Sequence, residues 1–156
     1  MDFARIDPRR DAELGATYKV EYEGEQLFHD GKPITISFLG LQSRTGKRAA
    51  AQMVKEMDKR AGKKRDLSKM SVDEMLNVAE HSDNTRAKFY AALTTGWANI
   101  SYIPDDKMDD PEATAEPLPY SKANAEMLFS TRPWMLEGID SFLSEKENFT
   151  QLAVKD

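Results

Sequence analysis

Residues 34–61 read ITISFLGLQSRTGKRAAAQMVKEMDKRA, and the hydrophobic period changes within this stretch. Ile34, Ile36 and Phe38 alternate with polar residues, which is the period of a half-buried strand. From Thr45 onward the apolar residues follow the period of an amphipathic helix. This switch predicts a small sheet that comes first and helices that follow it.

The alternation begins before this stretch. In residues 18–22, two tyrosines and a valine fall on one face of a strand, and charged residues fall on the other. Glu23-Gly24 and Asp30-Gly31 are dipeptides typical of tight turns. We therefore predict an antiparallel hairpin or three-stranded meander over residues 17–39, with an apolar face that the following helices cover.

Four or more helices are expected after the sheet. Residues 45–61 form the first. A capping box at Ser71 and Glu74 begins the next, because the serine hydroxyl can accept a hydrogen bond from the amide of the glutamate. The polar residues 81–84 are expected to interrupt that helix, and Gly96 suits a left-handed helix end. The resulting fold class is α+β and mainly α.

An acidic, proline-rich segment at residues 104–119 divides the helical part of the chain. It lacks an apolar period, so we expect a mobile loop. Ser121 is placed to cap the helix after it, and Pro133 suits the first turn of the last helix. The chain is interpreted as an N-terminal arm (1–15), a single α+β domain (16–149) and a C-terminal tail (150–156).

The composition excludes several classes of protein. The chain has 156 residues with 22 basic and 27 acidic side chains, a formal charge of −5, which disfavours nonspecific binding to nucleic acid. There is no cysteine, which excludes disulfides and thiolate metal sites. The N-terminal residues lack the apolar core of a signal peptide, and no apolar run is long enough to cross a membrane. We therefore expect a cytoplasmic protein.

No catalytic, cofactor or metal site is predicted. His29 and His81 are far apart, and neither has a neighbouring ligand at the spacing of a zinc site. Residues 40–47 resemble a phosphate loop only loosely, because Arg48 stands where a magnesium-binding hydroxyl belongs. The acidic segment lacks the spacing and the glycine of a calcium-binding EF-hand loop. We expect that the protein is not an enzyme.

A basic stretch at residues 44–65 carries nine lysines and arginines, with only Glu56 and Asp58 as acids. It is interpreted as a solvated helix face, as a surface for a protein partner or for the chain's own acidic segment, or as a nucleic-acid surface. No aromatic residue interleaves the basic ones, so stacking on bases has no support. The candidate basic contact residues are Lys47, Arg48, Lys55, Lys59, Lys63, Lys64 and Arg65.

Large apolar side chains are expected mainly in the helical core. Trp97 and Trp134 are interpreted as apolar anchors, each with an N–H group that needs a partner. The methionines suit either a core or an adaptable contact surface, and the core is favoured. Those at apolar helix positions are Met53, Met57, Met75, Met127 and Met135.

The last third of the chain carries an ordered set of motifs. A helix is expected to end in a Gly-Trp pair, a segment P-Y-S-K-A-N then starts another helix, and a final helix begins with Pro-Trp and is followed by Asn-Phe. This order resembles the tail assembly chaperones of long-tailed bacteriophages and prophages, over roughly residues 85 to 149. The long acidic segment after the Gly-Trp pair departs from the family pattern. The motif residues are Gly96, Trp97, Tyr120, Ser121, Asn124, Pro133, Trp134, Ile139, Phe142, Asn148 and Phe149.

The resemblance implies a function. Such chaperones bind the long tape measure protein and keep it soluble while the tail tube protein polymerises around it. The resemblance further implies homo-oligomers, a location in the cytoplasm of the host bacterium and absence from the mature virion. Two alternatives stay open: a nucleic-acid-binding regulator that uses the basic helix, and a structural tail or neck component of the virion.

Overall fold

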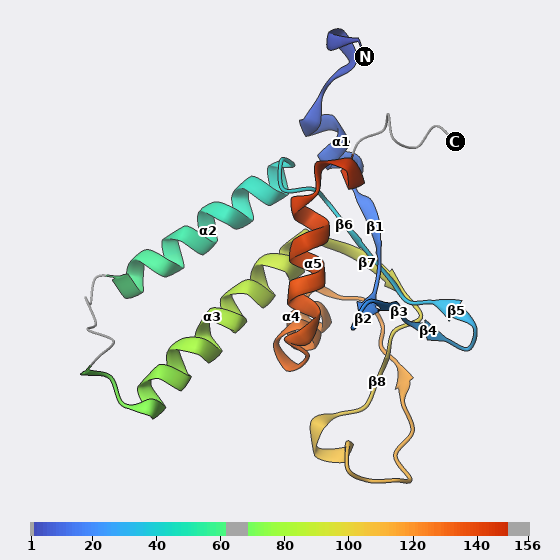
Figure 1. Cartoon of the computed structure of the whole chain (residues 1–156), viewed down its shortest axis with the longest axis vertical. Helices are drawn as coiled ribbons and strands as arrows, with labels where there is room; N and C mark the ends of the chain where they lie inside the picture. Colours follow the sequence, from blue (N-terminus) through green and yellow to red (C-terminus); the bar gives the residue numbers. More distant parts are fainter. Residues whose placement is uncertain (1, 62–68, 150–156) are drawn as a thin grey trace.

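The computed structural model describes residues 2–61 and 69–149 (Figure 1). Its centre is a three-stranded antiparallel sheet in the order β1-β6-β7. The strands are β1 (Ala16–Lys19), β6 (Thr35–Phe38) and β7 (Thr94–Ala98). The predicted switch of period is confirmed, because β6 is followed by the helix α2 (Arg44–Ala61). The α+β, mainly α fold class is also confirmed.

The segment between β1 and β6 is a pair of short ribbons. The turns fall at Glu23-Gly24 and Asp30-Gly31, as predicted, and all four residues have positive φ. The strands of these ribbons are β2 (Glu21–Tyr22), β3 (Glu25–Gln26), β4 (Phe28–His29) and β5 (Lys32–Pro33). The predicted meander was therefore wrong in one respect, because the third strand of the main sheet comes from β7 and not from residues before β6.

Two predictions about α3 (Val72–Leu93) were also wrong. The helix runs without a break through residues 81–84. It ends at Leu93 because the chain turns extended at Thr94 and pairs with β6. Gly96 is a residue of β7 opposite Ser37, has no positive φ and is not a left-handed helix end.

The remaining helices begin where local capping chemistry predicts. The hydroxyl of Ser71 accepts the amide of Glu74 at 3.2 Å, and the hydroxyl of Ser121 accepts the amide of Asn124 at 3.0 Å. Pro133 directly precedes the last helix. The bounds are α1 (Pro8–Leu14), α4 (Lys122–Thr131) and α5 (Trp134–Ser144), with the 3₁₀ turns η1 (Phe3–Arg5), η3 (Asp105–Lys107) and η4 (Lys146–Phe149).

The core lies between one face of the sheet and the helices α3, α4 and α5. Ile36 and Phe38 of β6 are fully buried there. The opposite face is polar: the hydroxyls of Thr17 and Ser37 lie 3.1 Å apart on it. Each buried large apolar side chain contributes about 1.5–3 kcal/mol relative to an exposed one, so the burial of Ile36 and Phe38 on this face stabilises the fold.

The N-terminal residues 1–15, interpreted as a polar arm, contain η1 and α1. Asp7 accepts the amides of the first turn of α1, and Pro8 supplies its first residue, which explains why a helix forms here. The helix buries Ala12 against Gly40, whose amide donates to the Ala12 carbonyl at 2.9 Å. A helix with one buried residue has no hydrophobic period that could be recognised in the sequence. The predicted C-terminal tail (150–156) lies outside the described residues.

Candidate protein-binding site

The Gly-Trp and P-Y-S-K-A-N motifs meet at the end of α3. The Tyr120 hydroxyl donates to the carbonyl of Thr94 at 2.6 Å, and the Trp97 Nε1–H donates to the carbonyl of Leu118 at 2.8 Å. The rings of Trp97 and Tyr120 meet edge to face, with centroids 5.2 Å apart. These contacts fix β7 and the start of α4 to the same point. We call this arrangement of Thr94, Trp97, Tyr120 and Lys122 the α3 clamp.

Lys122 completes the α3 clamp, a role that was not predicted from the sequence. Its Nζ donates to the carbonyls of Ala91 at 3.2 Å, Ala92 at 2.9 Å and Thr94 at 2.8 Å. The last carbonyls of a helix have no partner within the helix and carry partial negative charge, so an ammonium group there is stabilising. Burial lowers the pKa of Lys122 and raises that of Tyr120. The clamp holds β7 and the start of α4 to the end of α3.

The other motif residues are also mainly structural. Asn124 Nδ2 donates to the carbonyl of Pro119 at 2.8 Å, and Asn148 Nδ2 donates to that of Phe142 at 2.8 Å. Ile139 is fully buried in the core. Phe142 packs on Tyr18, Phe38 and Phe149, with ring centroids 5.2, 6.3 and 5.5 Å apart. Most of these motif residues therefore belong to the hydrophobic core or make hydrogen bonds that hold the neighbouring backbone.

Trp134 is the exception, and its prediction as a buried anchor was wrong. It is 43 % exposed and meets the ring of Tyr22 edge to face at 5.2 Å. At the start of α5 the core positions are taken by Met135 and Leu136, so the indole projects sideways onto the β2–β3 ribbon. Trp97, in contrast, is half-buried and hydrogen-bonded as expected.

The acidic loop is tied down at both ends. Arg132 Nη1 pairs with Asp105 Oδ1 at 2.7 Å, and Arg132 Nη2 donates to the carbonyl of Ile103 at 3.1 Å. The strands β8 (Ser101–Tyr102) and β9 (Glu116–Pro117) pair across the base of the loop. The expectation of a plain mobile linker therefore needs correction, because the loop has a fixed base. Its acidic residues themselves are exposed.

The basic residues of α2 lie on its solvent side. Lys47, Arg48, Lys55 and Lys59 are all exposed. Lys63, Lys64 and Arg65 lie outside the described residues. Figure 1 shows α2 and the loop at 104–119 on different sides of the molecule, with the helical core between them. The interpretation that the basic helix is matched by the acidic loop of the same chain was therefore wrong.

His29 and Ser101 lie close together, but their surroundings do not match a catalytic triad. His29 Nε2 lies 3.2 Å from the Ser101 hydroxyl, but the carboxylate oxygen of Asp30 lies 3.5 Å from the same nitrogen. A Ser–His–acid triad needs the acid on the other ring nitrogen, so this group is not one. Within residues 2–61 and 69–149, no cluster of three or more His, Cys, Asp or Glu residues could hold a metal ion. No helix in these ranges is long and apolar enough to cross a bilayer.

Among the described residues, the first half of α3 is one apolar surface that the core leaves uncovered. In the second half of this helix, Ala87 and Tyr90 are buried in the core. The same helix face continues toward the N-terminus at three- and four-residue spacing, past the half-buried Asp83, through Ala79, Leu76 and Val72. There it meets solvent: Val72 is 81 % and Leu76 54 % exposed. Figure 1 shows that the beginning of α3 extends beyond α4 and α5.

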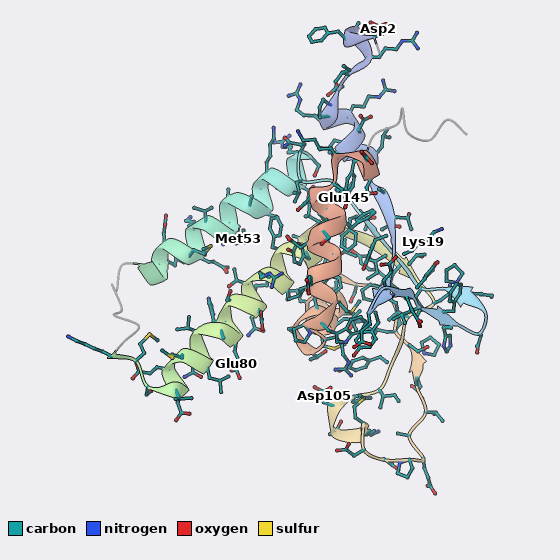
Figure 2. All side chains as sticks on the ribbon, viewed as in Figure 1. Asp2, Lys19, Met53, Glu80, Asp105 and Glu145 are labelled. Atoms are coloured by element: carbon teal, nitrogen blue, oxygen red, sulfur yellow. The ribbon has the colours of Figure 1, made fainter. Side chains whose placement is uncertain are left out.

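Met75 and Val78 widen this surface, and every residue from 71 to 80 is exposed. We call Val72, Met75, Leu76 and Ala79 the open α3 face. The interpretation of Met75 as a core residue was wrong, because the periodicity marks a helix face but not what covers it. Glu80, labelled in Figure 2, lies on this projecting half. The open α3 face is the candidate binding site.

A groove of about 360 Å³ runs between α2 and the second half of α3. Met53, which is labelled in Figure 2, lines this groove from α2, and Phe89 lines it from α3. Met53 is half-buried, but Met57 is exposed, so the core assignment of Met57 was wrong too. Met135, by contrast, is buried as expected.

The candidate site is an exposed apolar helix face. No protein-family model, no curated protein and no solved structure matches the chain.

Proposed function

We propose that this chain is a non-catalytic tail assembly chaperone of a long-tailed phage. It binds amphipathic helices of the tape measure protein on the open α3 face. The observation that carries the proposal is the continuation of the core-forming face of α3 past the core into solvent. The motif resemblance in residues 85–149 supports the choice of partner.

The open α3 face suits a helical partner for a physical reason. Its apolar residues repeat at the spacing that places them in one row, and a partner helix can bury such a row by lying against it. In this chain α4 already does so against the second half of α3. A partner helix beside the first half would extend the same packing. Met75 adds a soft side chain that fits different partner residues.

Burial of this row supplies a useful binding energy. A large apolar side chain transferred from water contributes about 1.5–3 kcal/mol, before the cost of association is subtracted. Two or three such side chains give a contact of moderate strength, which suits a chaperone that must release its client. Under this proposal the chaperone acts in the cytoplasm of the host, leaves before the virion is complete and allows the tube protein to take its place.

The test is co-expression with the tape measure protein of the same phage. The chain raises the soluble yield of that protein and elutes with it in gel filtration at moderate salt. The double variant Met75→Asp and Leu76→Asp abolishes both effects, since exposed positions tolerate the change but the partner's apolar face does not.

The matched control is Leu14→Asp with Phe28→Asp, two apolar residues of similar exposure, 59 % and 57 %, outside the site. This control variant keeps the wild-type yield. The proposal fails if the Met75 and Leu76 variant still binds, or if the unmodified chain binds the tape measure protein at neither low nor high salt. Retention on DNA alone would instead favour the nucleic-acid-binding alternative. Presence of the chain in purified phage particles would favour the other alternative, a structural tail or neck component of the virion.

A further inference from the structure

A pocket of about 310 Å³ lies where α1 meets the start of α2 (Figure 1). The two helices are joined there by the side chain of Glu13, which accepts the amide of Arg44 at 2.5 Å. Four basic side chains line this pocket, two from each helix. They are Arg9, Arg10, Arg44 and Lys47, and we call them the basic pocket residues.

The basic pocket residues are available to a ligand. All four are exposed. Within residues 2–61 and 69–149, none of their side chains lies at ion-pair distance from a carboxylate. Three of the four are arginines, and the planar guanidinium group presents a fork of donors that matches the oxygens of a phosphate or a carboxylate. The pocket therefore offers several unpaired donors to one anionic group.

The two acids of the pocket are bound to the backbone. Asp7 accepts the amides of Arg9 and Arg10 at 3.1 and 3.2 Å, and Glu13 accepts the amide of Arg44. The lining thus has four basic side chains against two acidic ones, in a chain whose formal charge is −5. This local excess of positive charge favours a ligand with two or more negative charges.

We propose that this pocket binds a free oligophosphate, a compound with two or more adjacent phosphate groups. Adjacent phosphates carry several negative charges on closely spaced oxygens, so they can pair with cations of both helices at once. Among the described residues, no aromatic side chain lines the pocket, so none stacks there on a base. The pocket therefore recognises the phosphates and not the group attached to them.

A free compound suits the pocket better than the backbone of a nucleic acid. The pocket is small, and its field is screened within about 8–10 Å at physiological salt. A long polyanion would extend beyond it and meet a chain with a formal charge of −5, which repels it. A short oligophosphate interacts only with the local positive charge.

Binding would also hold α1 to α2. The helix α1 buries only Ala12, whose carbonyl accepts the amide of Gly40 at 2.9 Å. A ligand that bridges Arg10 and Arg44 adds a contact between the two helices and stabilises the folded chain, because it binds the folded state and not the unfolded one. The inference does not depend on the proposed function, because the pocket shares no residue with the open α3 face.

The test titrates the chain with sodium triphosphate in a calorimeter at low salt. The unmodified chain binds triphosphate saturably and binds orthophosphate more weakly, because a single phosphate reaches fewer of the cations. Arg10→Gln with Arg44→Gln weakens triphosphate binding by about tenfold or more, because two charged donors are lost. Lys55→Gln with Lys59→Gln is the matched control. It removes the same charge from exposed positions of α2 outside the pocket and changes the affinity by about twofold or less.

Glu13→Gln is a second variant with the opposite expected effect. The glutamine keeps a side-chain oxygen for the amide of Arg44 but removes a negative charge from the pocket. The affinity for triphosphate therefore rises by about threefold. A thermal melt gives an independent readout, because triphosphate raises the melting temperature of the unmodified chain and not that of the Arg10 and Arg44 variant.

Three results would overturn the inference: no saturable binding of triphosphate, an equal loss in the control and in the Arg10 and Arg44 variant, or weaker binding by Glu13→Gln. Binding of duplex DNA without binding of triphosphate would overturn it as well and favour the nucleic-acid-binding alternative. The Met75→Asp and Leu76→Asp variant binds triphosphate like the unmodified chain, which separates this inference from the proposed function.

Discussion

Lys122 Nζ lies 2.8 Å from the carbonyl oxygen of Thr94, so a side chain of α4 caps the end of α3 and fixes the start of β7. The two residues are 28 positions apart. The same carbonyl accepts the hydroxyl of Tyr120 at 2.6 Å. Because α3 carries the open face at its other end, the α3 clamp holds the helix that presents the binding site.

Replacement of this ammonium group tests the clamp. Lys122→Met keeps most of the apolar stem but removes three hydrogen bonds to carbonyls. We expect a loss of about 1–3 kcal/mol in the free energy of unfolding, measured by urea denaturation, because the helix end loses its charged donor. Lys19→Met, at an exposed position of β1, is the control and changes stability by about 0.5 kcal/mol or less. Equal effects of the two substitutions would contradict the capping role.

Tyr90 provides a test by pH. Its hydroxyl donates to Asp140 at 2.6 Å, and burial together with this carboxylate raises its pKa from 10.0 to about 12. Between these values the unfolded chain loses the phenol proton and the folded chain keeps it. The folded state then binds more protons, so this group's contribution to stability falls as pH rises through the window, by up to about 1.4 kcal/mol per pH unit.

The Tyr90→Phe variant isolates this contribution. The difference in unfolding free energy between the unmodified chain and the variant should shrink from pH 10 to pH 12. The contributions of the other tyrosines and of Lys122 are common to both proteins and cancel. A difference that stays constant or grows over this range would show that the Tyr90 phenol is not held protonated by the fold.

Two glycines are expected to respond in opposite ways to alanine. A Cβ at Gly40 would lie 2.8 Å from the Cβ and 2.9 Å from the Cα of Ala12, so Gly40→Ala must displace α1 and should cost about 1–3 kcal/mol. A Cβ at Gly96 would meet nothing within 4 Å, and its φ is not positive. Gly96→Ala should therefore be neutral or stabilise by up to about 1 kcal/mol. Thermal denaturation of both variants measures the difference in stability. A strong loss of stability in the Gly96→Ala variant would contradict this conformation and favour a left-handed helix end at Gly96.

The two tryptophans should differ as well. Trp97→Ala removes a half-buried ring, the contact with Tyr120 and the hydrogen bond to Leu118, and should cost about 3 kcal/mol. Trp134→Ala removes a ring that is 43 % exposed and should cost about 1 kcal/mol or less. Chemical denaturation of both variants measures the difference. A larger loss at Trp134 would mean that its ring is buried.

Features governed by local chemistry were predictable from the sequence. The caps at Ser71 and Ser121 join residues three positions apart, and the switch from β6 to α2 lies in one continuous period. The strand β7 was missed because its partner β6 is distant in the chain and Thr94–Ala98 lacks alternation. Lys122 was missed for the same reason, since only the tertiary fold brings it to the end of α3.

Periodicity identifies the helix face of the candidate site but does not predict whether other elements cover it. Val72, Leu76 and Ala79 share one helix face with the buried Ala87 and Tyr90, so their pattern is that of a core. Whether a face is covered depends on how far the neighbouring helices reach. Here α4 and α5 do not reach the first turns of α3. No local sequence pattern indicates how far along α3 this contact extends.

Site-specific crosslinking tests the central claim most directly. A photoreactive phenylalanine analogue is placed at Leu76 on the open α3 face and, in a separate control, at Lys19 on β1. Both variants are co-expressed with the tape measure protein, irradiated and analysed for covalent products. The account predicts a crosslink to helical segments of the tape measure protein from position 76 and none from position 19. Crosslinks from position 19 alone, or from neither position while the complex is intact, would contradict it.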